Sequence, residues 1–386
     1  MKICIITSTR SDFGLLKNLI FEIKKNKNFI IKVIASGNHF SKKYGYTYNE
    51  IKNSKIKVDA KIKCKFNSDD PAGISNVMSK CMTDTTRLLK KMKPNLLIVL
   101  GDRYEILAST ISACLSRIPV AHIHGGEVTS GALDDAFRHS ITKMSNIHFV
   151  SNKIYKKRVI QLGENPRNVY VVGGLGVDSI SKTKLVSKEK LETKLKINLN
   201  KKNFLINFHP ETKNKNKSKK NINQLLAALK IFKKVNLIFT SPGADLENKN
   251  IINAVVKFCK SRRNAFYFKS LGQINYFSLL KCVDVMIGNS SSGILEMPYF
   301  RKGTINIGDR QLGRVQANSI INSKIKKKDI IRAIKKIFST SFKRKIIKNN
   351  FMYGPPGASK KITKILQKVN LNNLNKKFFF DLNQTY

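Results

Sequence analysis

Residues 96–127 read LLIVLGDRYEILASTISACLSRIPVAHIHGGE, and this stretch decides the fold. The apolar run Leu96–Leu100 ends in a polar turn, Glu105–Leu115 reads as a helix, and Ile118–Ile123 is apolar again. Two short apolar runs on either side of a helical segment are typical of a βαβ unit in a parallel sheet. The stretch therefore predicts an α/β protein.

The same alternation continues on both sides of this stretch. In the first half, strands are predicted at Ile3–Thr7, Ile30–Ala35, Ile147–Val150 and Val169–Val172, and helices at about Gly14–Lys25, at Asn76–Met92 and from Asp134 onward. The pattern then restarts, with strands at Phe204–Phe208, Val235–Thr240, Ala265–Phe268, Val283–Ile287 and Thr304–Ile307, and a last helix at Lys360–Val369. This restart predicts two similar doubly wound domains facing a cleft, divided near residue 175.

Composition agrees with two ordinary folded domains. The chain has 386 residues, 41% of them hydrophobic, which suits two medium cores. No apolar run approaches the roughly 18 residues that span a bilayer, and the apolar N-terminal stretch is too short for a signal peptide. The six cysteines form no CxxC pair, so neither a disulfide framework nor a zinc site is expected. We expect a cytoplasmic protein without a membrane partner.

The chain is strongly basic, with 73 Lys and Arg against 24 Asp and Glu and a net charge of +49. Such a charge would suit nucleic acid, but the lysines are scattered beside Asn and Ile over nearly every predicted element. No helix-turn-helix, zinc finger or arginine-rich arm is present. We expect no specific nucleic-acid partner, and we interpret the charge as an attraction for anionic substrates.

Polar clusters follow nearly every predicted strand of the first half, where open α/β sheets bind ligands. Arg10 enters a helix and suits a phosphate, although an ordinary capped helix start would look the same. The dinucleotide pattern GxGxxG is absent, which argues against a nicotinamide or flavin cofactor. His39 follows the next strand and is a weak signal alone. Asp102 with Arg103 suits acid/base work beside a phosphate clamp, and a capping aspartate is the plain alternative.

The segment from His122 to Glu127 and the helix start after it complete this set. On a strand, His122 and His124 would point to the same face, and the glycines between them and Glu127 would let a ligand approach the backbone. Asp134 is spaced to meet Arg138, and Asp135 to meet His139. A zinc or iron site is the alternative, since His-x-His with carboxylates binds such metals. We prefer an acid/base site without a metal, because no further His/Asp pair completes a metal pattern.

The second half offers a different kind of polar residue. His209 and Gly243 follow two of its strands, and small hydroxyl residues follow a third at Ser290 and Ser291. Glycine and serine at a helix start suit a phosphate, and Glu296 one turn later suits ribose hydroxyls. Arg310 lies beyond the next strand. No Walker motif is present, so a P-loop NTPase is excluded.

Taken in order, these motifs resemble the hydrolysing UDP-N-acetylglucosamine 2-epimerases. The resemblance runs from Met1 to about Val369 and rests on TRSDFG (9–14), GNH (37–39), GDR (101–103), GGE (125–127), DDAFRHSITK (134–143), HP (209–210), GNSS (288–291), RQLGR (310–314) and GAS (357–359). It implies two Rossmann-like domains in a glycosyltransferase-B-like arrangement, with residues 356–386 returning to the domain of residues 1–175, and with UDP bound by residues 176–355. It also implies a homo-oligomer and no cofactor.

The family reaction converts UDP-N-acetylglucosamine to N-acetylmannosamine and UDP through a 2-acetamidoglycal, in pathways to sialic-type acids. The resemblance implies acid/base roles for Asp102, Asp134 and Asp135 and a sugar-site role for His39. It implies UDP contacts for Arg10, Arg103, His209, Ser290, Ser291, Glu296 and Arg310.

The chain departs from the family pattern at two positions. Many members have a catalytic glutamate at the position of His124, so His124 or Glu127 takes that role or the substrate differs. Relatives often have asparagine where this chain has Gly243. Sister enzymes act on nucleotide-linked 2,4-diacetamido sugars for legionaminic-type acids, and this substrate is the alternative. A two-domain glycosyltransferase and a non-catalytic nucleotide-sugar or nucleic-acid binder are the remaining hypotheses.

Overall fold

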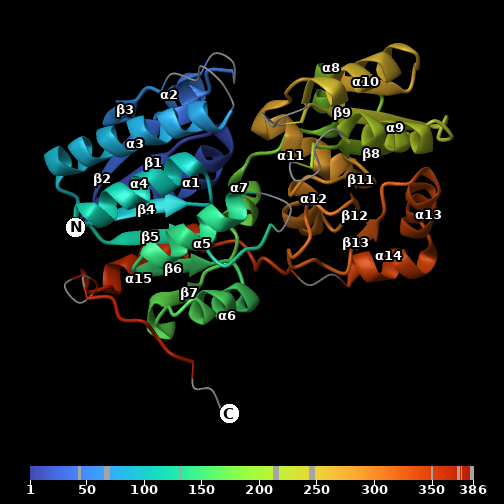
Figure 1. Cartoon of the computed structure of the whole chain (residues 1–386). Coiled ribbons are helices and arrows are strands. Elements are labelled where there is room, and N and C mark those ends of the chain that lie inside the picture. The colour runs from blue at the N-terminus through green and yellow to red at the C-terminus, as the bar shows by residue number, and fades with distance from the viewer. Residues whose placement is uncertain are drawn as a thin grey trace. The chain divides into compact units, whose positions relative to one another are not determined.

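The computed structural model describes residues 1–41, 45–64, 70–129, 133–211, 217–242, 248–348, 351–371, 374 and 376–382. The chain forms two compact units, which are described separately here (Figure 1). Unit 1 comprises Met1–Glu127, Leu133–Ser179 and Tyr353–Tyr386, and unit 2 comprises Val128–Ala132 and Ile180–Met352. Each unit contains one parallel sheet with helices between its strands, so the predicted fold class is confirmed.

Unit 1 is built on a seven-stranded sheet in the order β3-β2-β1-β4-β5-β6-β7. Its strands are β1 (Lys2–Thr7), β2 (Ile30–Ser36), β3 (Ala60–Ile62), β4 (Leu96–Leu100), β5 (Val120–Ile123), β6 (Ile147–Val150) and β7 (Val169–Val171). All five residues of β4 are buried, because helices cover both faces of a parallel sheet and leave no solvated side. The carboxyl ends of β4 and β5 therefore come to the same edge, in the register Leu100↔Ile123.

The helices of unit 1 enclose two apolar cores. They are α1 (Arg10–Lys24), α2 (Tyr48–Asn53), α3 (Pro71–Met92), α4 (Tyr104–Leu115), α5 (Asp134–Met144), α6 (Lys153–Gln161), α7 (Leu175–Lys182) and α15 (Ala358–Lys368), with short 3-10 turns η1 (Gly37–Phe40) and η2 (Pro166–Asn168). One core gathers side chains from α1 and α15, and the other gathers side chains from α3, α4 and α5. In Figure 1 the red α15 accordingly lies among elements from the N-terminal half of the chain.

The start of α15 is held by one buried carboxylate. Asp178 accepts hydrogen bonds from the backbone N–H of Gly357 at 2.8 Å, from the N–H of Ser359 at 3.2 Å and from the Ser359 hydroxyl. A carboxylate at a helix N-terminus satisfies N–H groups that have no partner inside the helix. Asp178 therefore fixes the point where the end of the chain rejoins unit 1.

Unit 2 repeats the strand order of unit 1 with six strands, β10-β9-β8-β11-β12-β13. They are β8 (Lys202–Asn207), β9 (Val235–Thr240), β10 (Ala265–Phe268), β11 (Val285–Gly288), β12 (Gly303–Ile307) and β13 (Ile320–Ser323). Its helices are α8 (Lys188–Leu195), α9 (Ser218–Leu229), α10 (Asn248–Lys260), α11 (Gly272–Cys282), α12 (Ser292–Leu295), α13 (Lys327–Ile337) and α14 (Thr340–Ile347), with a 3-10 turn η3 (Met297–Phe300). Counted within each unit, both sheets contain the order 3-2-1-4-5-6 of a doubly wound fold, and unit 1 adds a seventh strand after it.

Two predicted helix starts were too late in the chain. Helix α1 begins at Arg10 rather than near Gly14, because Thr9 accepts the N–H of Asp12 while the Asp12 side chain accepts the N–H of Thr9. This reciprocal capping pattern determines the first turn. Helix α3 begins at Pro71 rather than Asn76, with Asp70 as its N-cap. The short strands β3 and β13 carry too few apolar residues to give a signal.

Among the described residues, no helix is both long enough and apolar enough to cross a bilayer.

Candidate active site

The edge of unit 1 at the ends of β4 and β5 brings two carboxylates to one arginine. Arg138 lies in the second turn of α5, and its side chain is only 3% exposed. Its Nη2 donates to Asp102 Oδ2 in a short contact, and its Nη1 donates to Glu127 Oε2 at 3.5 Å. Asp102 follows β4 and Glu127 follows β5, so three separate segments meet at this guanidinium. We call Asp102, Glu127 and Arg138 the carboxylate–arginine cluster.

His124 adjoins this cluster with both ring nitrogens engaged. The backbone N–H of Leu175 donates to its Nε2 at 3.4 Å, so Nε2 is the nitrogen without a proton. Its Nδ1 then carries the proton and lies 3.4 Å from Glu127 Oε1. His124 has φ +66°, a left-handed conformation just beyond the end of β5 at Ile123. The expectation that His122 and His124 share one face of a strand was therefore wrong, since the strand ends between them.

His122 lies inside the protein against Gly101, the residue before Asp102. It is fully buried; its Nε2 is 2.8 Å from the carbonyl oxygen of Gly101 and its Nδ1 is 3.1 Å from Thr142 Oγ1. Burial lowers the pKa of His122 to about 3, so the ring is neutral at physiological pH. His122 thus ties the turn that carries Asp102 to the helix that carries Arg138.

The paired glycines after His124 lie close to other protein atoms. A Cβ at Gly126 would lie 2.5 Å from the carbonyl oxygen of Tyr155, and Gly126 also has φ +74°. A Cβ at Gly125 would lie 3.0 Å from Thr142 Oγ1 and 3.1 Å from His122 Nδ1. Packing against α5, α6 and the buried histidine therefore requires glycine at both positions, and the approach of a ligand to this backbone stays a prediction.

Asp134 and Asp135 form the first turn of α5, as predicted. The expected pair of Asp135 with His139 is confirmed, with Oδ2 and Nε2 3.7 Å apart. The expected pair of Asp134 with Arg138 stays a prediction.

Arg103 is a third exposed, and it lies against a fully buried glutamate. Its Nε is 3.3 Å from Glu105 Oε2, and its Nη2 is 3.4 Å from Glu105 Oε1. Burial lowers the pKa of Arg103, but the charges of Glu105 and of neighbours that include Asp134 raise it by more. Arg103 is therefore held in place by Glu105 and keeps an exposed part for an anion.

Arg10 at the start of α1 and His39 in the turn after β2 differ in exposure. Arg10 is half exposed, with its Nη1 3.9 Å from Glu50 Oε1. His39 is fully buried, with Nε2 3.0 Å from Thr7 Oγ1 and Nδ1 2.9 Å from Thr47 Oγ1. Burial lowers the pKa of His39. Of the two candidate residues, Arg10 presents its charged group to solvent and His39 does not.

The corresponding edge of unit 2 is organised by Asn289, which lies in the GNSS motif but was not among the predicted site residues. The fully buried Asn289 accepts the N–H of His209 at 2.6 Å and donates to the His209 carbonyl at 2.8 Å. Its own carbonyl accepts Arg310 Nη1 at 3.0 Å and Gln311 Nε2 at 2.9 Å. Asn289 therefore brings His209 and Arg310 to one place. An asparagine directly after a buried strand was the available signal.

The serines after β11 belong to a second hydrogen-bonded group in unit 2. Tyr276 donates to Ser292 Oγ at 2.7 Å, and Ser292 Oγ donates to Glu296 Oε2 in a short contact. Ser290 Oγ accepts the N–H of Ser292 at 3.3 Å, and Ser291 is the N-cap of α12. Burial raises the pKa of Glu296. Gly243 lies outside the described residues.

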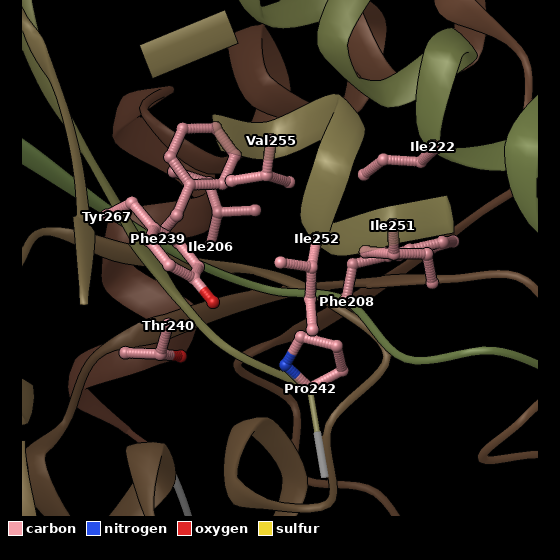
Figure 2. Close-up of a pocket in the computed structure, with 10 residues that line it drawn as sticks. All are labelled: Ile206, Phe208, Ile222, Phe239, Thr240, Pro242, Ile251, Ile252, Val255 and Tyr267. Carbon is pink, nitrogen blue, oxygen red and sulfur yellow. The ribbon is translucent and has the colours of Figure 1, made fainter. Parts of the chain in front are cut away.

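A small hollow in unit 2 has a different, mostly apolar lining. Figure 2 shows it enclosed by Ile206, Phe208, Ile222, Phe239, Thr240, Pro242, Ile251, Ile252, Val255 and Tyr267. Its lining is nearly all apolar, and its volume of about 10 Å³ gives room for roughly one water molecule. This hollow is a packing gap between β8–β10 and α10, and it has neither the size nor the charge for a nucleotide.

In the part of the chain that the structure describes, no three His, Cys, Asp or Glu side chains gather closely enough to hold a metal ion.

Comparison with known proteins places this architecture in a defined class. The fold is glycosyltransferase-B-like, and it matches the crystal structure of a UDP-GlcNAc 2-epimerase from Neisseria meningitidis bound to UDP-GlcNAc. The TM-score is 0.84 at 20% identity, over 96% of this chain and 100% of the other. The family model described as UDP-N-acetylglucosamine 2-epimerase matches residues 21–367. The chain belongs to this family.

Two curated relatives are similar over most of the chain. A hydrolysing GDP/UDP-N,N'-diacetylbacillosamine 2-epimerase from Campylobacter jejuni is 41% identical over 384 residues, which cover 99% of each chain. A UDP-N-acetylglucosamine 2-epimerase from Neisseria meningitidis serogroup B is 33% identical over 339 residues, which cover 88% of each chain.

Proposed function

We propose that this protein is a hydrolysing 2-epimerase that converts a nucleotide-linked 2-acetamido sugar to its free 2-epimer and UDP. Family membership supports the reaction class, and the carboxylate–arginine cluster is the observation that carries it. A two-domain glycosyltransferase would use its N-terminal unit mainly to hold an acceptor. The cluster therefore favours proton transfer over simple holding of an acceptor.

We propose the 2,4-diacetamido sugar of the Campylobacter jejuni relative as the substrate. That relative covers the whole chain at 41% identity, whereas the Neisseria meningitidis relative named for UDP-N-acetylglucosamine is 33% identical over a shorter stretch. UDP-N-acetylglucosamine is the second candidate. Both substrates carry the same C2 acetamido group, so the chemistry at C1 and C2 is shared.

Asp102 is our candidate for the group that removes the C2 proton. Its side chain is 24% exposed, whereas Glu127 is 2% exposed and has Arg138 and His124 against its two oxygens. A carboxylate must reach the proton it takes, so the more exposed one suits this role. Glu127 and His124 then support Arg138, which holds Asp102 in place. On this proposal Asp102 transfers the proton, so His124 does not have to replace the catalytic glutamate that many family members have at its position.

The proposed reaction needs proton transfer at C2 and loss of UDP from C1. Removal of the C2 proton with departure of UDP gives a 2-acetamidoglycal, and water then returns OH to C1 and H to the opposite face of C2. Asp134 and Asp135, at the start of α5, are our candidates for the second acid/base group. No redox cofactor is required, because no electrons leave the substrate.

The leaving diphosphate needs positive charge and N–H donors. We propose Arg10, Arg103, His209, Ser290, Ser291 and Arg310 as its contacts, with Glu296 and the position of Gly243 near the nucleoside and His39 supporting the sugar-binding loop. On this proposal unit 1 supplies proton transfer and unit 2 supplies nucleotide binding. We further propose a homo-oligomer, testable by light scattering, and a cytoplasmic location, which the six free cysteines support.

The test is an assay of the purified protein in D₂O with each nucleotide sugar. We expect release of UDP, and a free 2-epimer that carries deuterium at C2, with the 2,4-diacetamido substrate turned over faster. A glycosyltransferase would release UDP without deuterium at C2. Absence of turnover with both nucleotide sugars would reject the proposed reaction. A preference for UDP-N-acetylglucosamine would keep the reaction and replace the substrate.

A further inference from the structure

Two cysteines of unit 1 lie in contact inside the protein. Cys64 comes two residues after β3, and Cys81 lies in the middle of α3, 17 positions further along the chain. Their sulfur atoms are 3.4 Å apart, and both thiols are free. Both belong to the apolar core that α3 and α4 share. The remaining cysteines are Cys4, Cys114, Cys259 and Cys282.

The two thiols differ in a way that suits successive chemistry. Cys81 is fully buried, whereas Cys64 retains 9% of its surface. A hydrogen bond from Cys81 lowers the pKa of Cys64, and the same contact together with burial raises the pKa of Cys81. The acidic groups that act on the pair, Glu105 and Asp84, oppose ionisation. Cys64 is thus the more accessible and more acidic thiol, with a second thiol already in contact.

We propose that Cys64 and Cys81 form a redox-active dithiol that hydrogen peroxide converts to an intramolecular disulfide. The Cys64 thiol loses its proton, the thiolate attacks one peroxide oxygen and the O–O bond breaks. Cys64 becomes a sulfenic acid, and the leaving oxygen takes up the proton and departs as water. The Cys81 thiol then attacks that sulfur, and the S–O bond breaks with release of a second water. The two thiols together lose two electrons and two protons, which reduce one peroxide to two waters.

The position of the pair gives this link a structural consequence. Both thiols are close enough to Glu105 for its negative charge to raise their pKa. Glu105 is also the fully buried partner of Arg103. A disulfide would join the segment after β3 to α3 beside that carboxylate. In a reducing cytoplasm the pair stays as two thiols, so the link would form only under oxidative stress.

The experiment uses the full-length protein with a small excess of hydrogen peroxide, followed by thiol titration, intact mass and peptide mapping without reductant. We expect the six reactive thiols of the denatured protein to fall to four, with the loss of two hydrogens and a Cys64–Cys81 cross-link. Dithiothreitol should restore all six.

Variants make the assignment specific. Cys64→Ser and Cys81→Ser should each lose the cross-link, with Cys64→Ala and Cys81→Ala as second variants if serine disturbs the core. Cys282→Ser, at a partly exposed thiol elsewhere, should keep it. A cross-link between other cysteines, or added oxygen at Cys64 without the loss of two hydrogens, would overturn the proposal. Because every readout is covalent, the result does not depend on the proposed epimerase activity.

Discussion

The sheets of the two units share a strand order, but their polar edges are built from different chemical groups. At the edge of unit 1, Arg138 joins the carboxylates of Asp102 and Glu127. At the edge of unit 2, the side-chain amide of Asn289 bonds to the backbone of His209, and the backbone carbonyl of Asn289 accepts a hydrogen bond from Arg310. One topology therefore supports an ionised cluster in one unit and an amide-and-backbone framework in the other. The difference suits proton transfer in the first and nucleotide binding in the second.

The two edges also differ in how their parts depend on one another. Arg138 and Glu127 are both nearly fully buried, so each charge is tolerated only while its partner is present. The amide of Asn289 bonds to backbone groups, and each neutral hydrogen bond contributes only about 1 kcal/mol. Substitutions in unit 1 should therefore have larger effects than substitutions in unit 2.

The largest effect is expected at Asp102. Asp102→Asn keeps the shape of the side chain but cannot take a proton, so kcat should fall by roughly 10²–10⁴-fold. Affinity for UDP, measured by calorimetry, should stay near that of the natural protein. Asp84→Asn on α3, a carboxylate of similar exposure at 20%, is the matched control and should keep full activity. Full activity of Asp102→Asn would remove Asp102 from the mechanism.

Arg138→Leu should be the most destabilising of these changes. It leaves the buried Glu127 without its positive partner, which should lower the free energy of unfolding by about 3 kcal/mol in urea titrations. Adding Glu127→Gln should recover part of that loss. Arg87→Leu, at a 75% exposed arginine of α3, should change stability little. Equal losses in Arg138→Leu and Arg87→Leu would contradict the dependence of the buried charges on one another.

In unit 2 we expect a smaller effect, confined to binding. Arg310→Gln removes one charged donor, so affinity for UDP should weaken by about 10- to 100-fold, as expected for a hydrogen bond to a charged group. The effect on kcat at saturating substrate should be small. Arg332→Gln, at an 80% exposed arginine of α13, is the control and should bind UDP normally. A loss in kcat without a loss in UDP affinity would contradict the division of roles.

The last prediction concerns pH and again belongs to unit 1, where the effect near neutral pH is small. His122 has its pKa lowered to about 3, so between pH 6.5 and 3 the unfolded chain binds a proton that the folded protein does not. The neutral His122 therefore contributes fully to the free energy of unfolding above pH 6.5. Below that pH the free energy of unfolding falls by about 1.4 kcal/mol per pH unit. His122→Gln keeps an N–H donor for Gly101 but has no such titration. The free energy of unfolding of His122→Gln, measured in urea, should fall less steeply on acidification than that of the natural protein. Equally steep falls in the two proteins would show that His122 is not the cause.

Much of this fold could be read from the sequence because both sheets are buried on two faces. Strands such as Leu96–Leu100 and Val235–Thr240 are continuous apolar runs, and the structure has them at the predicted residues. Helix starts were less visible, since α1 depends on the reciprocal side-chain bonds of Thr9 and Asp12. Hydrophobic periodicity carries no information about such caps.

The site was predictable as a set of loops but not as a set of contacts. The sequence indicated that Asp102, Glu127 and the start of α5 follow neighbouring strands. It did not indicate that His124 adopts a left-handed conformation, or that His122 is buried under Gly101. These features depend on atoms from β6, α5 and α7, which are distant in sequence. Asn289 was overlooked for the same reason, because its partners come from two other loops.

The bond between Asp178 and the start of α15 has a consequence for how the protein is made. Unit 2 is contained within unit 1 along the chain, so a ribosome finishes Ile180–Met352 before it produces the helix that completes the first core. The core shared by α1 and α15 must therefore wait, with part of its apolar surface uncovered, until nearly the whole chain has emerged. Unit 2 has no such delay. The part that is synthesised first is the part that finishes folding last.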